Sequence, residues 1–174
     1  MSHTLKKIWN IVSTVLVALI VLCAVFLVGV RILGYQMFTV ISGSMEPQYS
    51  IGDLIAVKEV DPATIEVGDP ITFVLNEDLL VATHRVIEVD AANQHLYTKG
   101  DANDVADSAP VHFNNVIGVP QFAIPLLGYV SDFVQYPPGS YITLVVGTAL
   151  IVAVFVPDIV RAVRKGKEEE ETEE

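Results

Sequence analysis

Cysteine is almost absent from this chain, whose 174 residues include only Cys23, inside an apolar run. No disulfide can form within one chain, and no zinc site built on cysteines is available. Basic residues are scarce too, with 10 lysines and arginines against 21 acidic residues and a formal net charge of −11. This charge balance argues against a nucleic acid as a partner, because phosphate backbones repel a negative protein.

Metal-binding patterns are also missing. The four histidines, His3, His84, His95 and His112, show no His-x-x-x-His spacing. Asp101, Asp104 and Asp107 crowd one Gly- and Asn-rich stretch, where they favour a turn through bonds from side chain to backbone. Calcium binding is an alternative, but the glycine and final glutamate of an EF-hand loop are absent. We therefore expect no metal and no cofactor.

Long apolar runs, in contrast, are present. The chain is 52% hydrophobic, with a mean hydropathy of +0.51. Residues 11–30 carry no charge and are long enough to cross a bilayer core as a helix. Residues 141–156 form a shorter uncharged run, which could instead be a buried or interfacial helix. The first run exceeds the apolar region of a cleaved signal peptide, so we interpret it as an uncleaved anchor.

The basic residues predict how these spans are oriented. Lysines precede the first run at 6 and 7, and basic residues follow the second at 161, 164, 165 and 167. Between residues 32 and 139 only Lys58, Arg85 and Lys99 are basic, against 14 acidic residues. By the positive-inside rule both termini are cytoplasmic and the middle of the chain is external.

The middle segment is expected to be β-structured. Short runs rich in β-forming residues occupy 53–60, 69–75, 79–90 and 94–101, separated by Gly, Pro, Asn and Asp. Alternation over 81–89 places Arg85 and Val89 on one face, and His84 and Glu88 on the other. Pro70 cannot donate to a ladder, so its strand should start there or lie at an edge. Residues 115–134 are expected to be partly core and partly a surface near the lipid.

The fold class that follows is mostly β, a compact antiparallel β catalytic domain between two transmembrane helices. The expected boundaries are a cytoplasmic N-terminus at 1–10, an anchor helix at 11–33 and an external domain at 34–139. A second transmembrane helix follows at 140–157, and a cytoplasmic acidic tail at 158–174, whose "EEEETEE" end we expect to be disordered.

Two residues are candidates for nucleophilic catalysis. A serine hydroxyl attacks well only when a base within hydrogen-bond reach takes its proton. Ser44, in the stretch "VISGSMEP", is a candidate nucleophile, and His84 a candidate base. The alternatives are an ordinary turn for Ser-Gly-Ser, with Gly43 permitting a tight path, and a packing or surface role for His84.

Four stretches taken together resemble a known family. They are "SGSMEP" at 42–47, "GDLIAV" at 52–57, "THRVIEV" at 83–89 and "KGDANDVADSAPV" at 99–111. In order and position they resemble the boxes of type I signal peptidases, peptidase family S26. The similarity is to the Ser–His branch found in archaea, the endoplasmic reticulum and some Gram-positive bacteria.

The resemblance implies a serine endopeptidase that removes N-terminal signal peptides from secreted pre-proteins at the outer membrane face. Ser44 is then the nucleophile and His84 the base, and Asp101 and Asp107 are the two family aspartates. Ser42 would help the Ser44 N–H to hold the oxyanion. Small substrate residues are implied at the first and third positions before the cut. The implied partners are signal peptides, the lipid bilayer and the secretion translocon, at the cell membrane.

Position within the acidic stretch suggests different roles for the two aspartates. Asp101 follows Gly100 at the end of an expected strand, where it could cap a turn, whereas Asp107 is freer to reach His84. We therefore assign Asp107 to His84 and Asp101 to holding the loop. Two rival hypotheses remain: a non-enzymatic structural or adaptor subunit, and a Ser–Lys enzyme with Lys58 or Lys99 as base.

Overall fold

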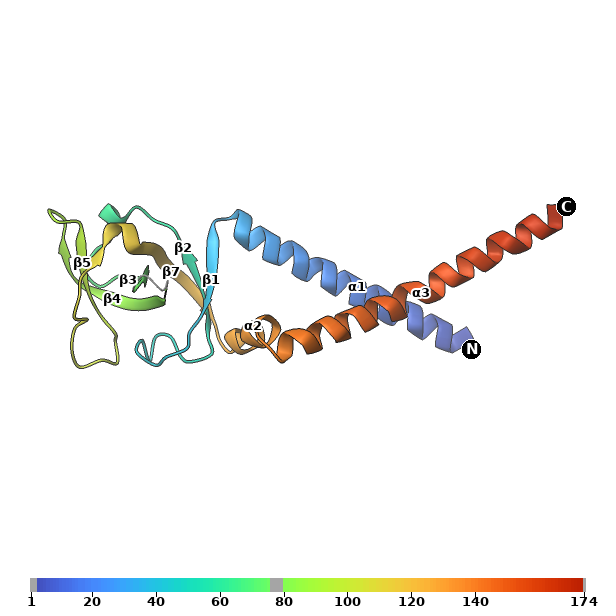
Figure 1. Cartoon of the computed structure of the whole chain (residues 1–174), viewed down its shortest axis with the longest axis horizontal. Helices are drawn as coiled ribbons and strands as arrows, with labels where there is room; N and C mark the ends of the chain where they lie inside the picture. Colours follow the sequence, from blue (N-terminus) through green and yellow to red (C-terminus); the bar gives the residue numbers. More distant parts are fainter. Residues whose placement is uncertain (1–2, 76–79, 174) are drawn as a thin grey trace. The chain divides into compact units, whose positions relative to one another are not determined.

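The computed structural model describes residues 3–75 and 80–173 (Figure 1). The chain divides into two units. One comprises Met1–Ala24 and Phe133–Glu174, which are almost entirely helical, and the other is the β-rich segment Val25–Asp132. Residue 79, the start of one expected strand, lies outside the described residues.

Two long helices, α1 (His3–Ile32) and α3 (Gly139–Glu173), contain the apolar runs. Among the described residues, Lys7–Ile32 and Gly139–Val156 are long and apolar enough to cross a membrane, judged by length and composition. Their most apolar windows are 0% and 6% buried, whereas the core helix of a soluble protein is mostly buried. The expectation of two apolar helices flanking a β domain is therefore confirmed, while their insertion in a membrane remains a prediction.

The acidic tail, which we expected to be disordered, is helical and belongs to α3. α3 continues to Glu173, through the run of glutamates. Glutamate and lysine have high intrinsic helix propensity, so a helix already started by the apolar run can propagate through them. The disordered end expected from charge alone therefore differs from the structure.

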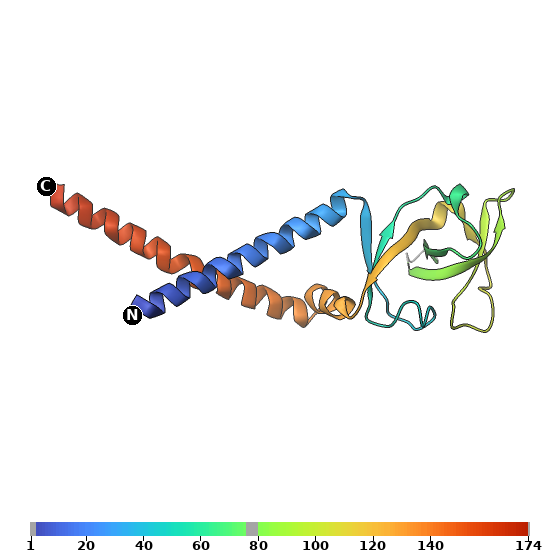
Figure 2. The same ribbon diagram turned by 180° about the vertical axis from the view of Figure 1, so that it is seen from behind.

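The β-rich unit is one antiparallel sheet, strongly curled into an open half-barrel (Figure 2). Its described strands are β1 Tyr35–Thr39, β2 Leu54–Lys58, β3 Pro70–Val74, β4 Val81–Asp90, β5 His95–Lys99, β6 Val111–His112 and β7 Val116–Ile124. Their spatial order is β1-β2-β7-β3-β4-β5-β6, and every neighbouring pair is antiparallel.

Four of these strands fall within the runs predicted from the sequence, but β1, β6 and β7 were not predicted. β7 lies in the segment expected to be core or near-lipid surface, and it is an interior strand of the sheet between β2 and β3. Its apolar residues are interrupted by Gly118 and Pro120, which hid the strand pattern. The short helix α2 (Leu127–Gln135) follows and was also missed.

Pro70 is the first residue of β3, which confirms one of the two expected placements, although β3 is not an edge strand. The alternation expected along β4 holds only as far as Val86. The register with β5 shifts between Val86 and Glu88, a bulge that moves the following residues by one face. Val89 therefore packs against the core that contains Val86, and not on the face of Arg85.

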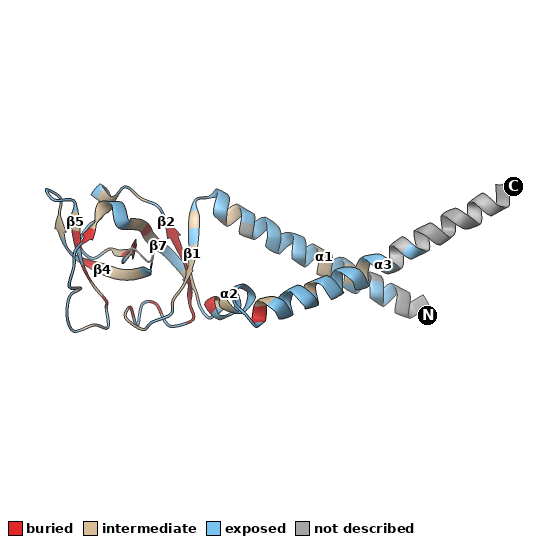
Figure 3. Ribbon diagram, viewed as in Figure 1, coloured by how far each residue is buried: buried red, intermediate tan, exposed pale blue. Residues whose placement is uncertain are grey.

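Buried residues, red in Figure 3, occur mainly on the strands of the β-rich unit. Their apolar side chains form two clusters. The first is built from Ile65, Ile71, Phe73, Val86, Leu96 and Val111. The second is built from Met45, Tyr49, Ile55 and Val57. The first cluster supports β4, which carries His84, and the second contains the neighbour of Ser44, so the two candidate residues rest on different cores.

Candidate active site

Ser44, His84 and Asp107 form one hydrogen-bonded chain. The Ser44 Oγ lies 3.2 Å from the His84 Nε2, and the His84 Nδ1 lies 2.6 Å from the Asp107 Oδ2. The His84 side chain is 13% exposed and that of Asp107 is 25% exposed, so the pair is shielded but open to a substrate. When Nδ1 carries the ring proton, Nε2 is free to accept the Ser44 proton.

Two contacts fix the position of Ser44: the burial of its neighbour Met45 and a hydrogen bond to the Ser44 backbone carbonyl. Met45 is 2% exposed in the second core, which fixes the chain just after Ser44. The Ser44 carbonyl accepts a 2.9 Å hydrogen bond from the Ala102 N–H. A Cβ on Gly100 would lie 2.6 Å from that carbonyl oxygen, whereas one on Gly43 would meet only the Glu46 carboxyl at 3.4 Å. The glycine whose missing side chain the close packing around Ser44 requires is therefore Gly100.

The aspartate is fixed from two directions by one threonine. The Asp107 N–H donates to the Thr98 carbonyl at 2.9 Å, and the Thr98 hydroxyl donates to the Asp107 Oδ2 at 2.6 Å. That same oxygen meets the His84 ring. Thr98 is 1% exposed, so this anchor is rigid. The His84 ring also packs edge-on against Phe73, with ring centroids 6.2 Å apart.

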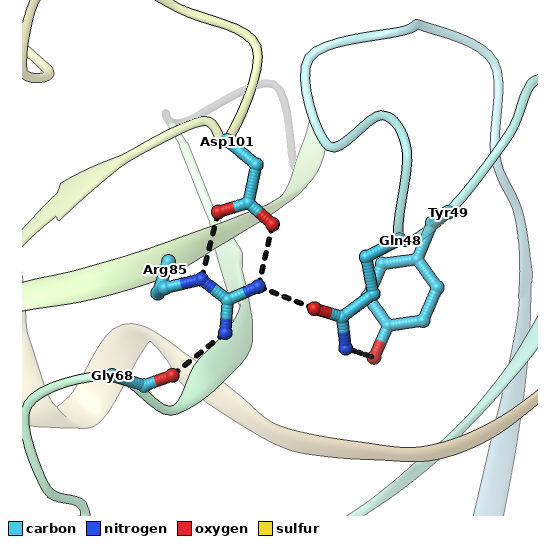
Figure 4. Close-up of polar contacts among 5 residues, drawn as sticks. All are labelled: Gln48, Tyr49, Gly68, Arg85 and Asp101. Carbon is cyan, nitrogen blue, oxygen red and sulfur yellow. Dashed lines mark hydrogen bonds and ion pairs between the residues drawn. The ribbon is translucent and has the colours of Figure 1, made fainter.

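Asp101 lies in a different network, centred on Arg85 (Figure 4). The Arg85 Nε donates to the Asp101 Oδ1 at 2.7 Å, and its Nη2 donates to the Oδ2. The same guanidinium donates to the Gly68 carbonyl at 2.7 Å and to the Gln48 side chain, whose amide contacts the Tyr49 hydroxyl. Arg85 thereby ties together three segments: the turn before β3, the acidic loop and the loop after Ser44.

Two residues of this network have raised pKa values, Arg85 and Tyr49. The hydrogen bonds that Arg85 donates to the Asp101 carboxylate raise the pKa of Arg85 above its usual value, which keeps the guanidinium charged. Burial raises the pKa of Tyr49, so its phenol stays neutral. The network is therefore a fixed ionic clamp.

The remaining candidates are distributed as follows. The Ser42 Oγ lies 3.3 Å from the Ser44 Oγ, beside the candidate nucleophile. Asp104 is exposed in the acidic loop. The Lys58 Nζ lies 5.7 Å from the centroid of the Tyr35 ring. Lys99 lies opposite Arg85 in the β4–β5 ladder, on the sheet face opposite to Thr98. Within the described ranges, no group of three or more His, Cys, Asp or Glu side chains could hold a metal ion.

Thr98, Arg85 and Gly100 were not assigned a role from the sequence. Gly100 is the second residue of the stretch "KGDANDVADSAPV", and Thr98 directly precedes that stretch. Arg85 directly follows His84. Their position next to candidate residues was the available signal. The contacts of these residues depend on which strands and loops meet in the folded chain, and the sequence pattern does not reveal this.

The arrangement has the parts of a nucleophilic site. A hydroxyl, an imidazole and a carboxylate are aligned by contacts of 3.2 and 2.6 Å, and a second hydroxyl lies beside the first. Such a set can transfer an acyl group, with the imidazole moving a proton between nucleophile and leaving group.

Comparison with known proteins points to one family, although no protein-family model matches the chain. The chain is 38% identical over 122 residues to "Signal peptidase I W" of Bacillus subtilis, covering 64% of each protein. It is 30% identical over 123 residues to human "Signal peptidase complex catalytic subunit SEC11C", again covering 64% of each. It is 29% identical over 133 residues to the sec11 catalytic subunit of Schizosaccharomyces pombe, covering 60% of this chain and 70% of the relative. The resemblance to type I signal peptidases is therefore confirmed.

Proposed function

We propose that this chain, a relative of the type I signal peptidases, is a membrane-bound serine endopeptidase that removes N-terminal signal peptides from secreted pre-proteins. The observation that carries the proposal is the hydrogen-bonded chain from Ser44 through His84 to Asp107. The matched stretch spans 64% of the Bacillus subtilis relative, so the activity rests on this geometry together with the similarity.

In the proposed mechanism, the Ser44 Oγ attacks the carbonyl carbon of the scissile bond. The His84 Nε2, 3.2 Å away, takes the hydroxyl proton and then gives it to the leaving amine. The Asp107 carboxylate accepts a hydrogen bond from the His84 Nδ1–H. This bond keeps the His84 ring in the required tautomer and stabilises the imidazolium. A water activated by the same imidazole then hydrolyses the acyl-enzyme.

The negative charge on the attacked oxygen needs hydrogen-bond donors. The Ser44 N–H and the Ser42 hydroxyl are proposed to supply them, since the two serine oxygens are only 3.3 Å apart. One such donor is worth about 10²–10³-fold in rate. Asp101, through its ion pair with Arg85, keeps the acidic loop in place and does not touch the reacting atoms.

An extended substrate segment fits the edge of β4. Along Val81–Arg85 this strand pairs with β3, whereas its pairing with β5 begins only at Arg85. In the described part of the chain, the second side of Val81–His84 therefore carries no strand. A substrate strand added there, beside the segment that leads to Ser44, would gain backbone hydrogen bonds next to the nucleophile.

The apolar helices give the enzyme a place to meet its substrate. We propose that Lys7–Ile32 and Gly139–Val156 span the cell membrane, with both termini cytoplasmic and the β domain outside. The enzyme would then lie in the lipid bilayer, together with the secretion translocon. A signal peptide held in the same bilayer is already confined near Ser44, which lowers the entropic part of the barrier.

The test is cleavage of a pre-protein by the purified full chain in phospholipid vesicles. We expect one cut at the end of the signal peptide, identified from the mass and N-terminal sequence of the product. A Lys58→Ala, Lys99→Ala double variant should retain activity, because neither lysine contacts Ser44 in the described structure. Absence of any cleavage by the folded chain would favour the non-enzymatic adaptor hypothesis, and inactivity of the lysine variant would favour a Ser–Lys enzyme.

A further inference from the structure

Thr98 is a polar residue in the core, beside the hydrogen-bonded chain of the site but outside it. Its side chain is 1% exposed, and it lies on β5 opposite Val86 of β4. Val86 and His84 are two residues apart on one strand, before the bulge, so the Thr98 side chain lies on the sheet face of His84. A buried hydroxyl needs a hydrogen-bond partner, and the partner of this one is the Asp107 carboxylate.

We propose that Thr98 is a positioning residue of the active site. Its hydroxyl selects the Asp107 conformer that faces His84, and it leaves the charge of the carboxylate available to the imidazolium. The inference rests on the proposed function, because it assigns a role in the same reaction to a residue behind the catalytic groups. Thr98 acts through Asp107 and is not itself a catalytic residue.

Two donors meet a single oxygen of the carboxylate. The Asp107 Oδ2 accepts from the Thr98 hydroxyl and from the His84 Nδ1, each at 2.6 Å. Hydrogens bound to such an oxygen prefer the plane of its carbon and substituents, so two donors together fix the orientation of that plane. The bond to His84 alone would leave the carboxylate free to turn about it. The Thr98 hydroxyl removes this freedom.

Without the hydroxyl, the Asp107 side chain would have room to turn away. It is 25% exposed and borders a pocket of about 180 Å³ next to His84. The bond from the Asp107 N–H to the Thr98 carbonyl fixes the backbone at this point, but not the side-chain torsions of Asp107. A carboxylate that turned into the pocket would gain water and lose the His84 ring. The Thr98 hydroxyl therefore favours the conformer that can assist the base.

The chemical type of the donor matters as well as its position. Asp101, in the same loop, is bound by the Arg85 guanidinium, whose positive charge balances its own. Asp107 is bound by a hydroxyl, which donates a hydrogen bond but carries no charge. Its negative charge therefore remains available to stabilise the imidazolium that forms when His84 takes the Ser44 proton. A cation in place of the hydroxyl would weaken this stabilisation.

The first test is Thr98→Val in the full chain, which keeps the shape of the side chain and removes the hydroxyl. We expect kcat for a signal-peptide substrate to fall about 10–100-fold, the value of a hydrogen bond to a charged group. KM should not change, because Thr98 is buried away from the substrate. Thr98→Ser keeps the hydroxyl and should retain most of the wild-type kcat.

The matched control is Thr72→Val. Thr72 is 0% exposed on β3, and its hydroxyl is hydrogen-bonded to the Thr83 hydroxyl at 2.8 Å. This variant therefore loses a buried hydrogen bond of the same kind away from Asp107. It should lower the melting temperature about as much as Thr98→Val does, and keep the wild-type kcat. If the two variants have the same kcat, Thr98 has only a structural role and the proposal is overturned.

A double-mutant cycle shows whether Thr98 acts through Asp107. In the Asp107→Ala background there is no carboxylate to position, so adding Thr98→Val should change kcat by less than about twofold. If the two losses multiply instead, the residues act independently and the assignment is wrong. A change in KM at constant kcat would contradict it as well.

A measurement without substrate separates this inference from the proposed function. The His84 Nδ1 proton, in its 2.6 Å bond to Asp107, should give a downfield resonance in proton NMR of the full chain in lipid nanodiscs. Its absence in His84→Ala assigns it. We expect the resonance in the wild type and in Thr98→Ser, and its loss or upfield shift in Thr98→Val. If this pattern is found but no signal peptide is cleaved, the proposed function fails while the role of Thr98 stands. An unchanged resonance in Thr98→Val would overturn that role.

Discussion

Replacing Asp107 with asparagine tests how His84 is activated. The Asp107 Oδ2 accepts from both the His84 ring and the Thr98 hydroxyl, each at 2.6 Å. If the asparagine oxygen takes this position, both bonds survive but the negative charge is lost. If the amide nitrogen takes it, the nitrogen must donate to Nδ1, and the ring adopts the tautomer that cannot accept the Ser44 proton. Both outcomes remove stabilisation of the imidazolium.

The expected loss of turnover is large and is not accompanied by unfolding. Base catalysis of this type is worth about 10²–10⁴-fold, which corresponds to about 2.7–5.4 kcal/mol of activation free energy. Asparagine has nearly the shape of aspartate, and its amide oxygen can keep both hydrogen bonds, so the free energy of unfolding should change little. We therefore expect Asp107→Asn to lower kcat by two to four orders of magnitude at an unchanged melting temperature.

The companion variant Asp101→Asn should behave differently. It removes the carboxylate that bridges to Arg85 with two hydrogen bonds. The side chains of Arg85 and Asp101 are 27% and 19% exposed, so solvent screening reduces the value of the pair to about 1–2 kcal/mol. For a domain of this size the melting temperature should fall by about 5–10 °C. The rate should fall less than in Asp107→Asn, because the loop only loosens.

Both variants are to be compared by turnover of a signal-peptide substrate and by melting temperature, with Asp104→Asn as the matched control. Asp104 is exposed in the same loop, and its replacement should change neither quantity. The reasoning is refuted if Asp101→Asn is inactive but fully stable while Asp107→Asn still turns over, because the two aspartates would then have exchanged roles.

Three further outcomes are expected. His84→Ala should remove measurable turnover, and a fully active variant would move the base to Lys58 or Lys99. Gly100→Ala should lower turnover at least tenfold and reduce the melting temperature, because its Cβ would lie 2.6 Å from the Ser44 carbonyl oxygen; Gly43→Ala, whose Cβ meets only a flexible carboxyl at 3.4 Å, is the control. Protease added to right-side-out cells should digest the β domain and spare the acidic tail, as the basic flanks of the apolar runs require, and digestion of the tail would contradict the proposed topology.

The sequence was informative where a local pattern determines the structure. The uncharged runs predicted both long helices, and alternation bounded by turn residues predicted β2, β3, β4 and β5. Pro70 predicted that its strand starts there or lies at an edge, because proline lacks the N–H that a central ladder position needs, and the first of these placements is the observed one. The ordered boxes around Ser44 and His84 predicted the family that the comparisons then supported.

Features set by long-range pairing could not be predicted in the same way. β7 has no clean alternation, because it is central in the sheet and carries a glycine and a proline. The bulge after Val86 changes the sheet face on which Val89 lies, and no residue of β4 is of a type that predicts a bulge. The anchoring of Asp107 by Thr98 and the clamp around Arg85 depend on loops that meet only in the folded chain.

Turnover of a signal-peptide substrate by Ser44→Ala tests the central claim most directly. The substitution removes one hydroxyl that contacts Ser42 and His84, and leaves the buried neighbour Met45 in place. We predict a protein that melts at the wild-type temperature and cleaves nothing measurable. Cleavage above a tenth of the wild-type rate by this variant would contradict the assignment of Ser44 as the nucleophile.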